Sequence, residues 1–204
     1  MRGKRCRAVG RASTHAKRLL NWGTLAAMIW LSTSTIARLR DQLRTRGQRP
    51  SVALGDGKQT PEEAELATMA AEYGPISEAM YLMMSADGKV TDDEREVLKG
   101  ALRNLSGDTI RGVHIEALLE RAAKAAETEG RDVRLQHVVE MLHEDPARAE
   151  VAFVLAAAIA FADNAIADEE NETLNSLAEG LGIDEDRASE LLDSVEADLA
   201  ERPA

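Results

Sequence analysis

Aromatic residues and cysteine are the scarcest components of this 204-residue chain, and each shortage narrows what the protein can be. Aromatics make up 3% of the residues, so a core has to be built from Ala, Leu, Ile, Val and Met. The single cysteine, Cys6, excludes an intrachain disulfide and any zinc site with several cysteines. The sequence also lacks alternating runs of Val, Ile and Thr, which argues against a sheet. An Ala- and Leu-rich, highly charged composition favours helices, so we predict an all-α fold.

Positive charge is scarce over most of the chain because it is concentrated near the N-terminus. Residues 1–50 contain twelve Lys and Arg residues against one acidic residue, whereas residues 51–204 contain 13 basic and 35 acidic residues. The net charge of −11 therefore combines a basic arm of +11 with an acidic body of −22. Phosphate binding requires clustered Lys and Arg, so the acidic body is not expected to bind nucleic acid.

The basic arm, residues 1–50, contains an uncharged run from Leu19 to Ala37. As a helix this run would be about 28 Å long, close to the span of a bilayer core. However, Asn, Gly, Ser and Thr dilute it, and only Leu25–Leu31 is strongly apolar. The pattern fits a signal peptide, an organelle transit peptide, or a helix lying on an anionic membrane with Trp22 and Trp30 at the interface. It equally fits a disordered tail, or translation that starts further along at Met28.

Residues 51–59 are predicted to be a flexible linker, because they end a Gly- and Pro-containing stretch with no period. Ordered structure is predicted to begin at Thr60, where Thr60-Pro61-Glu62-Glu63 has the pattern of a capping box. The helix that follows is predicted to break at Gly74-Pro75 and a second to run over Ile76–Ala86. Asp108 is predicted to cap the fourth helix of the body.

The later body contains a long apolar segment and further capped starts. Val151–Ala162 consists of twelve uncharged, mostly aliphatic residues, too short to span a bilayer and suited to a buried central helix that starts after Asp145-Pro146. Further helices are predicted over 168–181 and 184–201. The methionines Met80, Met83, Met84 and Met141 are interpreted as core filler rather than as soft-metal ligands. Residues 60–204 are therefore predicted to form one bundle of about seven or eight helices.

The body contains an internal duplication. Shifted by 76 residues, the segment MSADGKVTDDEREVLKGALRNL overlays AFADNAIADEENETLNSLAEGL without gaps. The matched positions include the Asp residues 87 and 163 and the Glu residues 94 and 170. The overlay predicts two pseudo-symmetric halves, each with an acidic loop between two helices, and their packing could bring both loops to the same end of the bundle.

The two loops resemble the second half of a calcium-binding EF-hand loop, but the first half is missing. The upstream ligand positions of a twelve-residue loop hold Met83 and Ser85 in one copy and Ile159 and Phe161 in the other. Apolar side chains cannot coordinate a hard cation, so a standard EF-hand is excluded. What remains is a candidate divalent-metal site of four carboxylates, Asp87, Glu94, Asp163 and Glu170, whose oxygen ligands favour Mg²⁺ or Ca²⁺ over Zn²⁺. Alternatively, these acids stabilise helix first turns.

The ADG-x-[VI]-x-x-x-E signature, with Leu at +11 and a second copy ending in AEGLGI, resembles the bacterial tellurite-resistance TerB-like family. That family includes the N-terminal domain of a membrane-anchored J-domain co-chaperone. The resemblance covers about residues 60–200. It implies an all-helical domain of two related halves, no enzymatic activity and a clustered acidic site with divalent-metal binding at the matching acids. It also implies a stress-response role through partner proteins or the cytoplasmic membrane face. Asn164 stands where the family's second motif has Gly.

The sequence therefore predicts a non-enzymatic helical domain in stress or tellurite resistance. It is expected to be cytoplasmic, with membrane association through the arm as one interpretation. The four histidines have no metal-ligand spacing, and no nucleotide-binding Gly motif is present. Two alternatives stay open: a metal-independent adaptor whose acidic surface docks a basic partner, which could be its own arm, and a carboxylate-based metal hydrolase.

Overall fold

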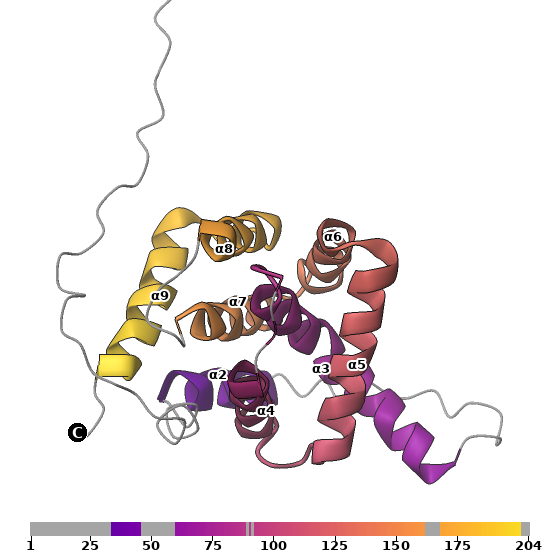
Figure 1. The fold of residues 1–204 in the computed structure, drawn as a ribbon. Helices are drawn as coiled ribbons and strands as arrows, with labels where there is room; N and C mark the ends of the chain where they lie inside the picture. Colours follow the sequence, from indigo (N-terminus) through magenta and orange to yellow (C-terminus); the bar gives the residue numbers. More distant parts are fainter. Residues whose placement is uncertain (1–33, 46–59, 89, 91, 162–167, 201–204) are drawn as a thin grey trace, which may run out of the picture.

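The computed structural model describes residues 34–45, 60–88, 90, 92–161 and 168–200. Within these ranges the regular secondary structure is entirely helical, which confirms the predicted all-α fold (Figure 1). The eight helices are α2 (Ser34–Thr45), α3 (Pro61–Met84), α4 (Asp92–Ser106), α5 (Gly112–Glu129), α6 (Arg131–Leu142), α7 (Pro146–Ala160), α8 (Asp168–Gly180) and α9 (Glu185–Ala200). None of the helices in these ranges is long and apolar enough to cross a membrane.

The centre of the bundle is the contact between α3 and α7, around which the other helices are arranged (Figure 1). Every residue of α7 from Val151 to Ala160 is buried, as its apolar sequence predicts. Asp145 caps the start of α7 by accepting hydrogen bonds from the amides of Ala147 and Arg148. Because α7 carries so many alanines, its neighbours can approach its backbone closely, and a core poor in aromatics can still be filled.

The predicted helix break at Gly74-Pro75 is wrong, because α3 continues through it. Proline has no N–H to donate to the carbonyl of Ala71, and its ring crowds that carbonyl. The guanidinium of Arg148, from α7, compensates: Nη2 donates to the carbonyl oxygen of Glu72 at 2.7 Å and lies 3.4 Å from that of Ala71. On the next turn, Ser77 Oγ donates to the carbonyl of Gly74 at 2.9 Å. A contact between two central helices thus makes the proline tolerable.

The predicted capping role of Asp108 is also wrong. Asp108 has a left-handed φ of 60° and belongs to the end of α4, where its amide donates to the carbonyl of Arg103 at 2.8 Å. Gly107, with φ 62°, donates to the carbonyl of Asn104, so the two residues close the helix with the double hydrogen bond of a Schellman motif. Helix α5 starts four residues later, with Arg111 as its N-cap.

The prediction that ordered structure begins at Thr60 is wrong as well. Helix α2 lies within the segment assigned to the basic arm and packs on α4, α7 and α9. Its Ile36 and Leu39 are 3% and 2% exposed and belong to the core. The many polar residues around Ile36 and Leu39 made this amphipathic helix difficult to recognise in the sequence. The capping box at Thr60 is confirmed: Thr60 N donates to Glu63 Oε2, and Glu63 N donates to Thr60 Oγ1.

Helix boundaries coincide under the 76-residue shift. Helix α3 ends at Met84 and α7 at Ala160, whereas α4 begins at Asp92 and α8 at Asp168. Helix α6 lies between the two sets and has no counterpart in the overlay. The coincidence concerns the segments where the sequence match is densest, and the pseudo-symmetry of whole halves stays a prediction.

Candidate functional site

The first acidic loop begins as a tight turn at the end of α3. The amide of Ala86 donates to the carbonyl of Met83, and that of Gly88 donates to the carbonyl of Ser85 at 3.1 Å. Gly88 has φ 79°, a left-handed conformation that side chains disfavour, which explains the Asp-Gly pair. Asp87 is exposed on this turn, and Glu94 is half-buried in the first turn of α4.

The second loop is described only from Asp168 onward. Glu170 is half-buried in the first turn of α8, beside the exposed Asp168 and Glu169. Three acids in one first turn are favoured by the helix dipole. Asp163 and Asn164 lie outside the described residues. Each of the three described candidate ligands, Asp87, Glu94 and Glu170, has a polar or electrostatic partner within the protein.

Arg131 connects the two loop regions. From the first position of α6, its Nη2 donates to the carbonyl of Leu82 in the last turn of α3 at 2.9 Å. The same Nη2 lies 3.1 Å from Thr173 Oγ1 in α8, and that hydroxyl donates in turn to the carbonyl of Glu169. One guanidinium therefore ties the helix that leads into the first loop to the helix that follows the second. Its Nε is buried and has no hydrogen-bond partner among the described residues.

A cavity of about 310 Å³ lies at this junction and has residues of both loop regions in its wall. Ala86 contributes from the first turn and Glu169 from the second, and Arg131 and Thr173 line it between them. The remaining polar lining consists of Asp132, Glu172 and Ser176. No motif in the sequence marks these residues as part of a site. Glu169 and Glu172 stand three apart on α8, so they share a face, but nothing in the sequence places Asp132 opposite them.

The described carboxylates do not by themselves form a metal cage. Within the described ranges, no three His, Cys, Asp or Glu side chains converge closely enough to hold a metal ion. Two of the histidines there lie beside arginines instead: His114 Nε2 is 3.0 Å from Arg111 Nη2, and His137 Nδ1 is 3.0 Å from Arg134 Nη1. Since Asp163 lies outside these ranges, the predicted four-carboxylate set stays a prediction.

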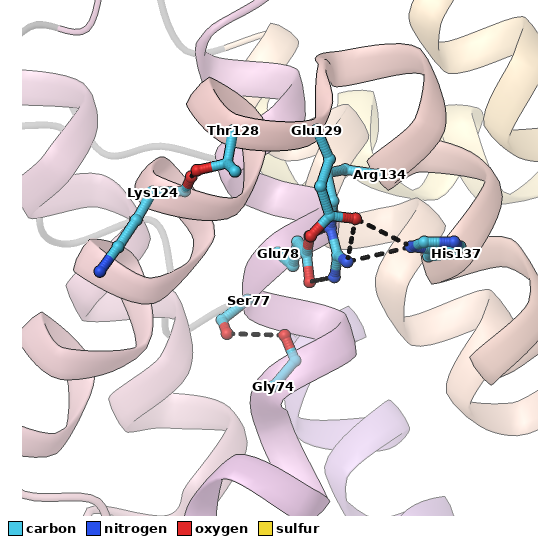
Figure 2. A network of polar contacts seen from close by, with 8 residues as sticks. All are labelled: Gly74, Ser77, Glu78, Lys124, Thr128, Glu129, Arg134 and His137. Atoms are coloured by element: carbon cyan, nitrogen blue, oxygen red, sulfur yellow. Dashed lines mark hydrogen bonds and ion pairs between the residues drawn. The ribbon is translucent and has the colours of Figure 1, made fainter.

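A second polar cluster joins α3, α5 and α6 (Figure 2). Arg134 holds Glu78 in a bidentate ion pair, with Nε–Oε1 at 2.6 Å and Nη2–Oε2 at 2.9 Å. Its Nη1 donates to Glu129 at 3.2 Å, and His137 lies on the far side of the guanidinium. The hydrogen bonds to Glu78 raise the pKa of Arg134. Because both members of the Glu78 pair are largely buried, this cluster fixes how three helices meet.

The fold and the first loop together define a class of protein: an all-helical domain with an acidic turn between the buried end of α3 and the acidic start of α4. A family model described as "Tellurite resistance protein TerB" matches residues 76–193, which is more than half of the chain. The chain belongs to the TerB family, as its loop signature suggested. No curated protein and no solved structure matches it significantly.

Proposed function

We propose that this TerB-family domain is a non-enzymatic module of tellurite or stress resistance that binds a divalent cation through its two acidic loops. The observation that carries the proposal is the shared cavity, whose wall contains Ala86, next to Asp87, and Glu169, next to Glu170. Carboxylates that approach this cavity from both loop regions would repel one another. A divalent cation would offset their repulsion, and oxygen donors suit Mg²⁺ or Ca²⁺.

Arg131 is the feature through which a bound ion would act on the protein. Its guanidinium holds α3 and α8 together. A cation between the loops would replace part of this attraction and change the spacing of the two helices. Such a change would alter the surface offered to a partner protein, so the module would respond to metal by changing its partner binding.

Calorimetric titration of the full chain with Mg²⁺, Ca²⁺, Mn²⁺ and Zn²⁺ tests the proposal. We expect saturable heat with Mg²⁺ or Ca²⁺, and its loss in the Asp87→Asn/Asp163→Asn variant. The matched control, Glu185→Gln/Asp186→Asn, removes two charges from the first turn of α9, a helix that does not line the cavity. Absence of saturable heat with all four ions would overturn metal binding, and so would equal heat in the loop variant. Phosphoester turnover in the presence of the ion would overturn the non-enzymatic assignment.

A second candidate is a metal-independent adaptor, favoured by the surface of α8 and α9. Residues 168–200 contain twelve acidic residues and one basic residue, Arg187. That guanidinium is already engaged by Glu150 and Glu190. The remaining negative charge suits a basic partner, including the arginine-rich residues 1–33 of this chain. Salt-sensitive binding of a synthetic 1–33 peptide to a 34–204 fragment, unchanged by EDTA, would support this candidate; its failure to bind would exclude the arm as that partner.

We also propose that the basic arm, residues 1–50, associates with the cytoplasmic face of the membrane. Arginines attract anionic headgroups, and Trp22 and Trp30 suit the interface. Fractionation of cells that express the full chain or residues 34–204 tests it. Equal recovery of both proteins in the soluble fraction would contradict membrane association.

A further inference from the structure

A second cavity, of about 360 Å³, lies between α3, α5 and α6, away from the acidic loops. One wall is a face of α3 made of small residues, Ala67, Ala70, Ala71 and Gly74, which recur at helical spacing. Leu118 and Ala122 of α5 and Met141 of α6 supply the other apolar walls. The volume falls at the lower end of the range for small-molecule clefts, and most of the residues that line it are apolar, as is typical of such clefts.

Part of the apolar wall of this groove is exposed, although Leu118 and Ala122 are buried. Ala67 and Ala71 are exposed, and Met141 is 47% exposed, contrary to its predicted role as core filler. A Cβ placed on Gly74 would meet no atom within 4 Å, so the space above that residue is open. The groove therefore offers apolar contact area that the described helices do not cover.

The charged groups in the lining differ in their availability. Glu78 lies on α3 one turn beyond Gly74 and is paired with Arg134 of α6, and their charges are satisfied by each other and by Glu129. Lys124, one turn along α5, points away from this pair (Figure 2). Arg121 lines the groove, is exposed, and forms no hydrogen bond or ion pair with the described part of the chain. It is thus the cation that can accept a ligand.

We propose that this groove binds an aliphatic monocarboxylate, with its chain along the small-residue face of α3 and its carboxylate on Arg121. Charge complementarity determines the head group, because an ion pair to a guanidinium is geometrically specific and stronger than a neutral hydrogen bond. The apolar walls determine the chain. The Glu78–Arg134 pair bounds the groove along α3, which suits a short chain better than a helix that runs through it. This site is separate from the acidic loops and goes beyond the proposed metal function.

Titration of the full chain with octanoate, followed in ¹H–¹⁵N spectra, tests the proposal, with 1-octanol as the uncharged probe of equal length. We expect saturable shifts at the amides of Ala71 and Gly74 and weaker binding of octanol. Arg121→Gln should weaken octanoate binding about tenfold, the loss of one charge-assisted contact. Ala71→Leu should abolish binding by filling the groove from an exposed position that does not disturb the core.

Two matched variants control for nonspecific effects. Arg103→Gln removes an exposed arginine from α4, and Ala197→Leu adds apolar surface to α9, both outside the groove. Both should bind octanoate as the unaltered chain does. Absence of saturable binding would overturn the proposal and favour a partner's acidic helix as occupant. Equal affinity for octanol would overturn the assignment of an anionic ligand, and unchanged binding by Ala71→Leu would overturn the location.

Discussion

At the residue scale, the Arg148 side chain compensates for a proline, Pro75, in the interior of helix α3. Pro75 deprives the Ala71 carbonyl of its intrahelical donor, and the Arg148 guanidinium reaches that turn from α7. An intramolecular hydrogen bond contributes about 0.5–1.5 kcal/mol net to stability, and of the two Arg148 contacts the one with Glu72 is the shorter and less exposed. The arginine therefore belongs to the folding of α3 even though it is part of another helix.

The first prediction is a double-mutant cycle on this contact. Arg148→Met keeps the aliphatic stem but removes the donors, so it should lower the free energy of unfolding by about 1–2 kcal/mol in urea denaturation. In a Pro75→Ala background the same change should cost less, because the substituted alanine restores an N–H for the Ala71 carbonyl. Arg103→Met is the control and should be close to neutral. Strictly additive effects of Arg148→Met and Pro75→Ala would show that the two residues are not coupled.

The second prediction concerns Tyr73, which is buried in α3. Burial, with a contribution from the nearby Glu72 carboxylate, raises the pKa of the Tyr73 phenol above its ordinary value of 10.0. In the unfolded chain the Tyr73 phenol ionises near pH 10, whereas in the folded chain it keeps its proton at that pH. Stability from this residue is therefore complete below pH about 10 and is lost as the pH rises further. Urea unfolding between pH 8 and 11 should show this loss, and Tyr73→Phe should reduce it. Tyr81→Phe is the matched control and should leave the pH-dependent loss of stability as it is in the unaltered chain. If Tyr81→Phe reduced this loss as much as Tyr73→Phe does, the assignment to Tyr73 would be contradicted.

At the scale of helices, the packing of α6 on α8 depends on a glycine. A Cβ on Gly180 would lie 2.7 Å from Val139 Cγ2, which is too close for a real contact, and 3.0 Å from Cγ1, which is tight. Gly180 lies in the last turn of α8, so only its missing side chain lets the two helices approach. This close approach also holds α8 against the helix that carries Arg131.

The third prediction follows from that contact. Gly180→Ala should lower the free energy of unfolding by about 1–3 kcal/mol, because the added methyl group overpacks the interface. Val139→Ala on its own should cost about 1 kcal/mol from the lost methyl groups. The double variant should be more stable than Gly180→Ala, since the space vacated by valine accepts the new methyl. Thermal unfolding measures all three proteins, and absence of rescue would place the strain of Gly180→Ala elsewhere.

Helix starts were predictable from the sequence because capping is local. Thr60 with Glu63, and Asp145 with Pro146, contain their donors and acceptors within four residues, and the structure has helices at both places. Continuity through Pro75 was not predictable, because it depends on Arg148 from another helix. The capping role predicted for Asp108 was wrong for a related reason. An acidic residue at a helix boundary can close the preceding helix as well as cap the next one.

The candidate site was predictable to a similar extent. Periodicity and turn chemistry placed Asp87, Glu94 and Glu170 at the ends of the correct helices. The role of Arg131 could not be predicted, because its partners Leu82 and Thr173 lie on two other helices. The same holds for the groove at Arg121, which needs three helices to form. Sequence patterns locate side chains along one element, whereas cavities depend on how several elements meet.

At the scale of the whole molecule, the division into a basic arm and an acidic body has to be redrawn. The arm and body differ in charge, but Ile36 and Leu39 of the arm lie in the core of the body. Helix α2 contacts α4, α7 and α9, which come from the first and the last parts of the body. Arg44 also lies close over Gly107, where any side chain would collide with it. The packed domain therefore includes α2.

The fourth prediction tests this boundary by truncation. A chain of residues 34–204 should unfold at nearly the same temperature as the full protein, because it keeps every described helix. A chain of residues 46–204 should lose about 3–6 kcal/mol, since removal of Ile36 and Leu39 uncovers apolar surface worth about 1.5–3 kcal/mol for each side chain. In the full chain, Leu39→Asp should reproduce the loss, while Arg38→Asp, at an exposed position of the same helix, should not. Equal stability of 34–204 and 46–204 would mean that α2 contributes nothing to the fold, and the domain would then begin at Thr60.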